Sequence, residues 1–228
     1  MTARIDEKPI VFDANEVKAV LAGYKIQHRV PTLTSEQISA GYEWDFGADG
    51  DAAIFYKYDN DGISIEKTLL IDCPFGAIGD RLWVKEPFIP DPPADHDAWE
   101  DQDSVTNYFQ WDGCGSKLSE IPKRLRKPEH VIYKASWDDS DAMIWVRAAQ
   151  MRKWASRILL EITDISIERV QNVTHNDSVK EAAFTFYPKQ AVPPLSAFPR
   201  YWMLKHGDDA WRLNPWVWVI EFKVIDDK

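Results

Sequence analysis

Hydrophobic side chains along this chain recur mostly in short alternating runs, a pattern that predicts more strands than helices. The most regular run covers residues 156–169, where apolar side chains alternate with polar ones from Ile158 to Ile167, apart from a break at Asp164. Shorter strands are expected at residues 9–12, 131–135 and 216–225, and a strand or hairpin arm at residues 63–71. Residues 34–62, which are rich in glycine and aspartate, indicate only loop and weak strand.

Short helices are predicted where capping residues precede apolar positions spaced three or four residues apart. Asp13 and Glu16 form such a capping box, and Gly23 ends the helix that follows. Thr174 caps a second helix. The second and third helices are expected over residues 175–183 and 198–206.

Strands of mixed length with a few short helices predict an α+β fold, in the form of a small mixed β-barrel with helices at its rim. At 228 residues the chain suits a single domain spanning residues 1–228, interrupted by insertions at about residues 34–62 and 87–130. The second insertion is rich in proline and acidic residues. Its aromatic side chains favour an ordered insertion rather than a linker.

Residues 73–86 combine two glycine turns with a short strand whose two faces differ in character. Leu82 and Val84 share one face of this strand. The other face carries Arg81, Trp83 and Lys85. Two cations beside a tryptophan suit a phosphate and a stacked base. The alternative is a half-buried strand whose tryptophan packs beneath a loop.

The formal net charge is −10, which argues against a protein that binds nucleic acid by bulk electrostatic attraction. The charge is uneven, because residues 43–66 and 86–141 are acidic whereas residues 147–205 carry nine basic side chains against five acidic ones. A basic face is therefore compatible with the acidic total. A mixed, solvated surface explains the same pattern.

Two cysteines, Cys73 and Cys114, predict cytosolic thiols rather than a disulfide or a zinc site. The histidines lack the spacing of metal ligands, so neither a metal nor another cofactor is expected. No apolar run approaches the roughly 20 residues that cross a bilayer, and the polar N-terminus lacks a secretory signal. A membrane is therefore not expected among the partners.

Three segments follow one another in a specific order: residues 21–29 after the first helix, residues 79–86, and residues 153–158 followed by the long strand, the Thr174 helix and residues 215–222. The first segment, Leu-Ala-Gly-Tyr-Lys-Ile-Gln-His-Arg, is similar to Leu-x-Gly-x-Lys-Thr-x-Thr-Arg. Together the segments resemble the ASCH domain family of the PUA-like superfamily, in particular its members encoded by bacteriophages and prophages. This resemblance implies a β-barrel with a cleft beside the glycine-lysine turn, the handling of RNA or modified nucleotides, and a location in the cytoplasm of a bacterial host.

Some members of that family resemble amidohydrolases acting on acetylated cytidine, in which a lysine and a threonine after the first helix work with a glutamate on a later helix. Lys25 and Glu181 match the lysine and the glutamate. This chain has Ile26 and His28 at the positions where the family has threonine, so the hydroxyl nucleophile is missing. His28 is instead a candidate general base that would activate a water molecule. A hydrolase acting on an amide of a modified pyrimidine, or on an RNA phosphodiester, would therefore use Lys25, His28 and Glu181.

A binding function would instead use the cations and the tryptophan of the matched segments. These candidate nucleic-acid-binding residues are Lys25, Arg29, Arg81, Trp83, Lys85, Lys153 and Arg157. Structural roles remain open for three of the candidates: a solvated cation at a helix end for Lys25, an exposed helix acid for Glu181, and for Arg157 an ion pair with Glu161 or Asp164.

The sequence thus leaves three hypotheses about function. The first is a single PUA-like domain that binds RNA or a modified nucleoside or nucleotide. The second is the hydrolase with the variant set of catalytic residues. The third is a phage protein that binds a host protein through its acidic insertion, within residues 91–119.

Overall fold

Extended backbone dominates the computed structural model, which describes residues 5–34, 36–37, 40–49, 52–62, 65–90, 121, 123, 126–137, 144–182 and 194–225. The strands are β1 (Glu7–Val11), β2 (Gln27–Pro31), β3 (Glu43–Asp49), β4 (Ala52–Tyr58), β5 (Ile65–Asp72), β6 (Arg81–Lys85), β7 (Phe88–Pro90), β8 (Val131–Tyr133), β9 (Leu159–Arg169) and β10 (Trp216–Ile225). The α-helices are α1 (Ala14–Leu21), α5 (His175–Lys180) and α6 (Pro194–His206), and short 3₁₀ helices cover Pro128–His130, Lys134–Ser136, Ala148–Gln150, Lys153–Ala155 and Val170–Asn172. The fold is therefore α+β, mostly sheet with few helices, as predicted. None of the helices in the described ranges has the length and apolar character of a membrane span.

The described strands form separate sheets rather than a barrel. Hydrogen bonding gives the strand orders β1-β6-β9-β10-β2, β3-β4-β5 and β7-β8. Within the described residues β1 and β2 are the edges of the first sheet, so that sheet does not close and the predicted barrel is wrong. The physical reason is that β3, β4 and β5 pair with one another instead of bridging those two edges. Alternation along a strand reveals the strand but not its neighbours.

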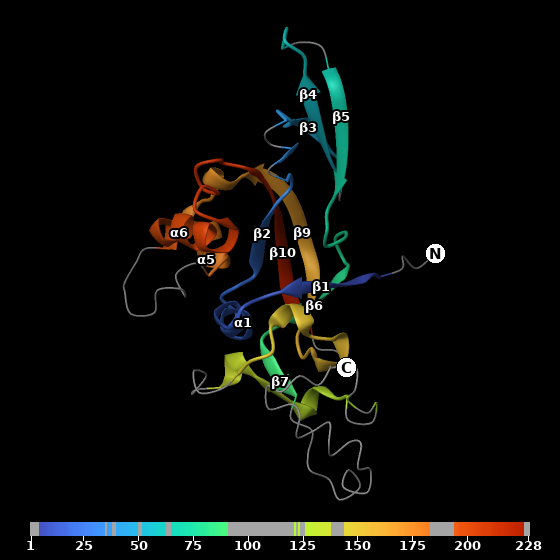
Figure 1. Ribbon diagram of the computed structural model, residues 1–228, viewed down its shortest axis with the longest axis vertical. Coiled ribbons are helices and arrows are strands. Elements are labelled where there is room, and N and C mark those ends of the chain that lie inside the picture. The colour runs from blue at the N-terminus through green and yellow to red at the C-terminus, as the bar shows by residue number, and fades with distance from the viewer. Residues whose placement is uncertain are drawn as a thin grey trace, which may run out of the picture. The chain divides into compact units, whose positions relative to one another are not determined.

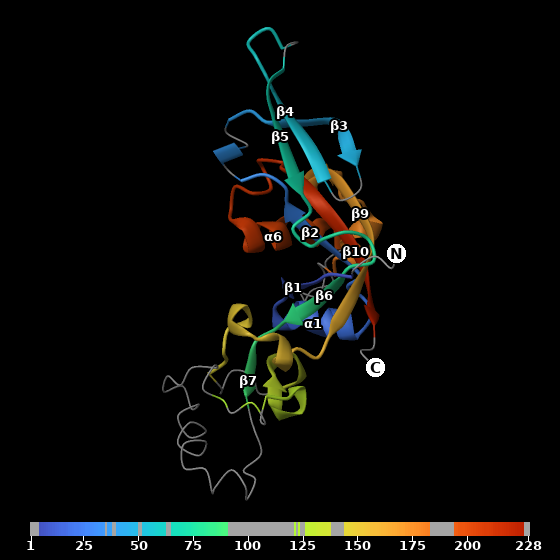
Figure 2. The same cartoon turned by 90° about the vertical axis from the view of Figure 1, so that its right-hand side faces the viewer.

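Internal contacts divide the chain into two units. The first contains Met1–Lys8, Ala19–Leu82 and Leu160–Lys228, and the second contains Pro9–Lys18 and Trp83–Leu159. Figures 1 and 2 show the elements of each unit in two views. The single domain and the insertion boundaries expected from the sequence stay predictions.

In the first unit, α6 packs on one face of β2 and β10, and Figure 1 shows it beside α5. β2 and β10 pair antiparallel, with Arg29 opposite Val219. Val219 belongs to a buried cluster with Phe198 and Trp202 of α6. Because directly opposed residues of an antiparallel pair project to the same face, Arg29 lies on the face that the helices cover, and its neighbour His28 lies on the other.

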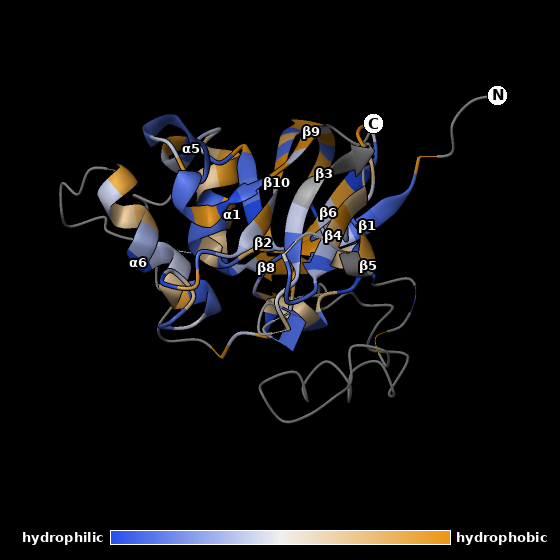
Figure 3. Cartoon of the chain, turned by 90° about the horizontal axis from the view of Figure 1, so that it is seen from above, coloured by the Kyte–Doolittle hydropathy of each residue, from blue (hydrophilic) through white to orange (hydrophobic). Residues whose placement is uncertain are grey.

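Several predicted elements of the first unit are confirmed with small shifts at their ends. β9 begins at Leu159 rather than at residue 156, and Figure 3 shows hydrophobic and hydrophilic residues alternating along it. β10 covers the predicted residues 216–225. α5 begins after Thr174, which forms a capping box with Asp177.

The segment expected to be loop and weak strand contributes to a sheet of its own. In this sheet β4 lies between β3 and β5, with Phe55 opposite Trp44 on one side and Leu69 on the other. Phe55 is buried, and Trp44 meets Trp216 of β10 edge to face, with ring centres 4.9 Å apart. Backbone N–H and C=O groups can pair between strands whatever the side chains are. The glycine and aspartate residues therefore obscured the alternation of apolar and polar residues in the sequence, but they did not prevent the sheet from forming.

In the second unit, a smaller core surrounds the antiparallel pair of β7 and β8. Its buried side chains are Phe88, Val131, Tyr133, Met151 and Ala155. The predicted capping box of α1 is confirmed, because the N–H of Asp13 donates to Oε2 of Glu16 and the N–H of Glu16 donates to Oδ1 of Asp13, both at 2.9 Å. Residues 91–120, which make up most of the predicted acidic insertion, lie outside the described residues.

The turn before β6 depends on a glycine with positive φ and on one carboxylate. Gly76 has a φ of +108°, and a Cβ added there would lie 2.4 Å from Oδ2 of Asp80. That oxygen accepts the N–H of Ala77 at 2.9 Å, while Oδ1 accepts the N–H of Asp6 at 2.9 Å. A side chain at residue 76 would therefore displace the carboxylate that holds the turn to the segment before β1.

We expect Gly76→Ala to lower the free energy of unfolding more than Gly79→Ala, a matched substitution in the same turn. Gly79 also has a positive φ, of +92°, but no atom lies within 4 Å of its added Cβ. Its substitution therefore carries only backbone strain, about 1–3 kcal/mol. Urea unfolding of both variants measures the difference, and equal losses would contradict the role assigned to Asp80.

Candidate functional site

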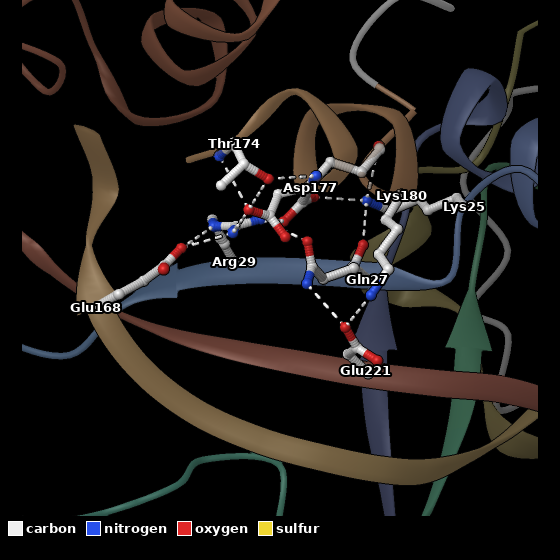
Figure 4. A network of polar contacts seen from close by, with 9 residues as sticks. Lys25, Gln27, Arg29, Glu168, Thr174, Asp177, Lys180 and Glu221 are labelled. Carbon is white, nitrogen blue, oxygen red and sulfur yellow. Dashed lines mark hydrogen bonds and ion pairs between the residues drawn. The ribbon is translucent and has the colours of Figure 1, made fainter. Parts of the chain in front are cut away.

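Backbone hydrogen bonds join the start of β2 to the end of α5 and to β10. The N–H of Ile26 donates to the carbonyl of Lys180 at 2.9 Å, and the N–H of Phe222 donates to the carbonyl of Ile26 at 3.0 Å. These bonds bring together segments that are far apart in the sequence. Polar side chains from these segments and from β9 form one network, shown in Figure 4 and called here the β2–α5 network: Lys25, Gln27, Arg29, Glu168, Thr174, Asp177, Lys180, Glu181 and Glu221.

Lys25 and Glu181 form an ion pair within this network. Nζ of Lys25 lies 3.0 Å from Oε2 of Glu181, and it also donates to the carbonyls of Gln27 at 3.0 Å and of Glu181 at 3.2 Å. The two side chains are 0% and 1% exposed. The solvated cation and the exposed helix acid considered for these positions are therefore wrong. Three acceptors match the three N–H donors of the ammonium group.

The guanidinium group of Arg29 interacts with three carboxylates. Nη1 donates to Oε1 of Glu181 at 3.2 Å, while Nε and Nη2 donate to Oε1 of Glu168 at 3.1 and 2.6 Å. Nη2 also lies 3.6 Å from Oδ2 of Asp177. Burial opposes the charge, but the carboxylates of Glu181 and Glu168 outweigh it and hold the pKa of Arg29 above its usual value. Arg29 therefore stays cationic inside the protein.

Gln27 and Glu221 extend the network toward solvent. Oε1 of Gln27 accepts from Nη1 of Arg29 at 2.6 Å, and Nε2 of Gln27 donates to Oε1 of Glu221 at 3.1 Å. Nζ of Lys180 pairs with the same oxygen of Glu221 at 2.5 Å. The side chains of Glu168, Lys180 and Glu221 are 28%, 26% and 30% exposed. These three residues are therefore accessible to a ligand from solution.

The network holds three cations against four carboxylates. Each cation has a carboxylate within 3.2 Å, so the positive charges are compensated inside the protein. At Lys25 and Arg29 a phosphate would have to displace a carboxylate from a buried pair, which is strongly unfavourable. Hydrogen-bond donors and acceptors side by side suit a polar molecule without net charge better than an anion.

Thr174 begins α5 and positions Asp177 for the network. Oγ1 of Thr174 accepts the N–H of Asp177 at 3.2 Å, while Oδ2 of Asp177 accepts the N–H of Thr174 at 2.9 Å and its hydroxyl at 2.6 Å. Burial opposes ionisation, but these hydrogen bonds and the charge of Arg29 lower the pKa of Asp177 below its usual value. The carboxylate of Asp177 therefore takes part in capping α5 and also balances part of the positive charge of Arg29.

His28 does not share this face of β2. Gln27 and Arg29 flank it and project into the network, so alternation along the strand places His28 on the opposite face. There its cross-strand partner is Ile220, and its ring meets that of Phe75 edge-on, with centres 6.3 Å apart.

The protonation of His28 also differs from that of a typical surface histidine. Burial, followed by the charge of Lys25, lowers the pKa of the imidazole well below its usual value. Of the three candidate catalytic residues, Lys25 and Glu181 form an ion pair, whereas His28 projects from the opposite face of β2 and is affected by the charge of Lys25.

The remaining candidate nucleic-acid-binding residues are divided between the two units. Arg81 belongs to the first unit, where Nη1 lies 3.8 Å from Oε1 of Glu7. The second unit contains Trp83, Lys85, Lys153 and Arg157. β6 alternates between half-buried and buried positions, which confirms its two predicted faces. The structure places Lys85 over Trp83, with Nζ 5.7 Å from the ring centre, and leaves Lys153 exposed in a 3₁₀ helix.

Arg157 belongs to a structural ion pair. It donates to both carboxylate oxygens of Glu86, at 2.9 and 3.1 Å, and its guanidinium lies 4.0 Å from the centre of the Tyr133 ring. Burial raises the pKa of Glu86, although Arg157 opposes that shift. The alternative considered for Arg157, an ion pair with Glu161 or Asp164, is therefore wrong in its partner, which is the buried Glu86 at the end of the 73–86 segment.

Apart from Glu181, sequence reasoning did not identify the carboxylates around Arg29 and Gln27, which are Glu168, Asp177 and Glu221. Glu221 had a detectable signal, because an acidic residue within the apolar run of β10 requires a buried or half-buried partner. Asp177 had a weaker one, as the third helical residue after the Thr174 cap. Glu168 lies in the alternating part of β9 and carries no signal that distinguishes it from a solvated residue.

Comparisons with protein-family models, with curated proteins and with solved structures find no match. Within the described ranges, no three or more His, Cys, Asp or Glu side chains are grouped so that they could hold a metal ion. The chemistry of the site is therefore judged from its own geometry.

We expect Lys25→Met to lower the free energy of unfolding by about 3–5 kcal/mol, because it removes one partner of a buried ion pair. Lys223→Met is the matched control. Nζ of Lys223 lies 2.6 Å from Oε1 of Glu161, but the lysine side chain is 57% exposed, so its loss should cost less than about 1 kcal/mol. Urea unfolding compares the two variants. A loss in Lys25→Met as small as in the control would show that the buried pair contributes little.

We expect His28 to destabilise the folded chain as the pH falls below about 6.5. Its pKa is lower in the folded state than in the unfolded state, so the unfolded chain binds a proton that the folded chain does not. Across that interval, stability falls by about 1.4 kcal/mol per pH unit. His28→Gln should flatten the unfolding free energy between about pH 6.5 and 5. His175→Gln, at an exposed position, serves as the control. Identical pH profiles for wild type and His28→Gln would refute the prediction.

Proposed function

We propose that this chain is a PUA-like protein of the ASCH type, encoded by a phage or prophage, that binds a modified nucleoside or nucleotide, or a short RNA that presents one, in the bacterial cytoplasm. The β2–α5 network is the centre of the proposed site. One contact supports the proposal above all. Lys25 and Glu181, which the resemblance to the ASCH family selects from segments 156 residues apart, lie 3.0 Å from each other.

Binding is better supported than hydrolysis. A hydrolase of the family kind needs a nucleophile next to the lysine, and this chain has Ile26 and His28 where the family has threonine. His28 lies on the other face of β2, so it is not placed to activate a water beside the Lys25–Glu181 pair. Both groups of that pair are also engaged by protein partners.

The charge balance favours recognition of a base over recognition of a phosphate backbone. The cations of the network are paired with carboxylates, so few of them are available to replace counterions on RNA. The half-exposed Glu168, Lys180 and Glu221 offer both acceptors and a donor to the polar edge of a base. We therefore expect an affinity that changes little with salt concentration.

Isothermal titration calorimetry with a panel of modified nucleosides and short RNAs tests the proposal. At least one member should bind. Lys180→Met should weaken that binding by about tenfold or more, since Lys180 is the half-exposed ammonium group of the network and holds Glu221. Lys223→Met is the control, because its ion pair with Glu161 is outside the network. Mass spectrometry of the same mixtures should recover the ligand uncleaved.

Absence of binding across the panel would refute the proposal. Equal losses in Lys180→Met and Lys223→Met would move the binding site away from the network. Cleavage of a nucleoside or of RNA would favour the hydrolase. The third hypothesis, binding of a host protein through residues 91–119, concerns a segment outside the described residues and stays a prediction.

A further inference from the structure

Among the described residues of the second unit, lysine and arginine side chains outnumber acidic ones. The acidic side chains there already have partners: Glu86 pairs with Arg157, Glu129 pairs with Lys127, and Asp13 and Glu16 form the capping box of α1. Lys85, Arg147 and Arg152 of the same unit form no ion pair in the described part of the chain. These three cations are therefore available to an anion from solution.

The three cations are gathered around one short 3₁₀ helix. Nζ of Lys85 donates to the carbonyl of Ala149 in the middle of that helix. Arg147 is its N-cap, and Arg152 directly follows its C-cap, Met151, which is buried in the core of the second unit. Arg147 and Arg152 are exposed, and Lys85 is half-buried. The three side chains therefore belong to one short stretch of surface, called here the Lys85–Arg152 surface.

The positive charges of this surface repel one another. Burial, followed by the charge of Arg152, lowers the pKa of Lys85 from its usual value. An anion bound between the two side chains would relieve that repulsion, and it would not have to displace a carboxylate. In the β2–α5 network, by contrast, each cation has a carboxylate within 3.2 Å. The Lys85–Arg152 surface therefore suits a phosphate better than the network does.

We propose that the Lys85–Arg152 surface binds the phosphate backbone of single-stranded RNA. The inference rests on the proposed function, which makes RNA the polyanion to expect, and it adds a second contact region with chemistry of its own. Guanidinium groups bind phosphates through paired N–H donors. Lys85 also lies over Trp83, with Nζ 5.7 Å from the ring centre, and cations beside an aromatic ring are typical of surfaces that bind single strands.

The two contact regions should differ in how their affinities depend on salt. A nucleoside bound at the β2–α5 network meets cations that are already paired, so salt should change its affinity little. RNA bound at the Lys85–Arg152 surface releases counterions from its phosphates. For a single strand, the logarithm of the association constant falls by about 0.7 per tenfold rise in salt for each phosphate neutralised, so three cations predict a slope of about −2.

Fluorescence anisotropy with the full chain and a labelled, unmodified oligouridylate of about twelve nucleotides tests the proposal. Unmodified RNA isolates the backbone contacts from recognition of a modified base. The double variant Arg147→Gln/Arg152→Gln should reduce the magnitude of the salt slope by about 1.4, and weaken binding about tenfold at low salt. Arg212→Gln is the matched control, because this arginine of the first unit is 76% exposed and pairs with Asp209. It should leave the slope unchanged.

All three substituted arginines are exposed, so the variants should fold, and urea unfolding checks that they do. A salt slope that is the same in wild type and in the double variant would overturn the inference. A polyglutamate peptide or phosphatidylglycerol vesicles that bind as tightly as RNA and require the same arginines would also overturn it, in favour of an acidic protein or a membrane. If the oligouridylate does not bind but a modified nucleoside binds in a way that depends on Lys180, the inference fails and the proposed function stands. If no nucleoside and no RNA binds, both fail.

Discussion

The structure of the first unit depends on a buried ammonium and a buried carboxylate, those of Lys25 and Glu181. Neither charge can be removed from water alone without a large penalty, so the start of β2 and the end of α5 must meet in one geometry. The backbone bond between Ile26 and Lys180 fixes the same junction. Burial of charge therefore specifies where the helix lies on the sheet, in addition to whatever stability the pair contributes.

Arg29 extends this constraint from α5 to α6. Its guanidinium is bonded to Glu181 and Glu168 on one side and lies over Phe198 on the other. Phe198 in turn packs in the core cluster that holds α6 on β10. The polar network and the hydrophobic core are thus adjacent layers on one face of β2.

Local patterns in the sequence predicted local structure well. The capping box at Asp13, the helix cap at Thr174 and the alternation in β6 depend on residues a few positions apart, and all of them are present, as is the strand predicted at β10. Features that depend on distant pairing were not predictable in this way. The separate β3-β4-β5 sheet, the open edges of the larger sheet and the pairing of Arg157 with Glu86 are set by contacts across the fold. The candidate site was predictable in part. The resemblance to a known family selected Lys25 and Glu181, but only the structure reveals that both are buried and that Glu168 and Asp177 also lie beside Arg29.

The carboxylate of Asp177 has a consequence for dynamics. One of its oxygens both closes the first turn of α5, through Thr174, and lies 3.6 Å from Arg29. Any molecule that changes the position of Arg29 must alter the free energy of opening that turn, and by reciprocity the opening must alter the affinity for the molecule. Hydrogen exchange at the amide of Thr174 therefore reports on the occupancy of a site that this amide does not itself touch.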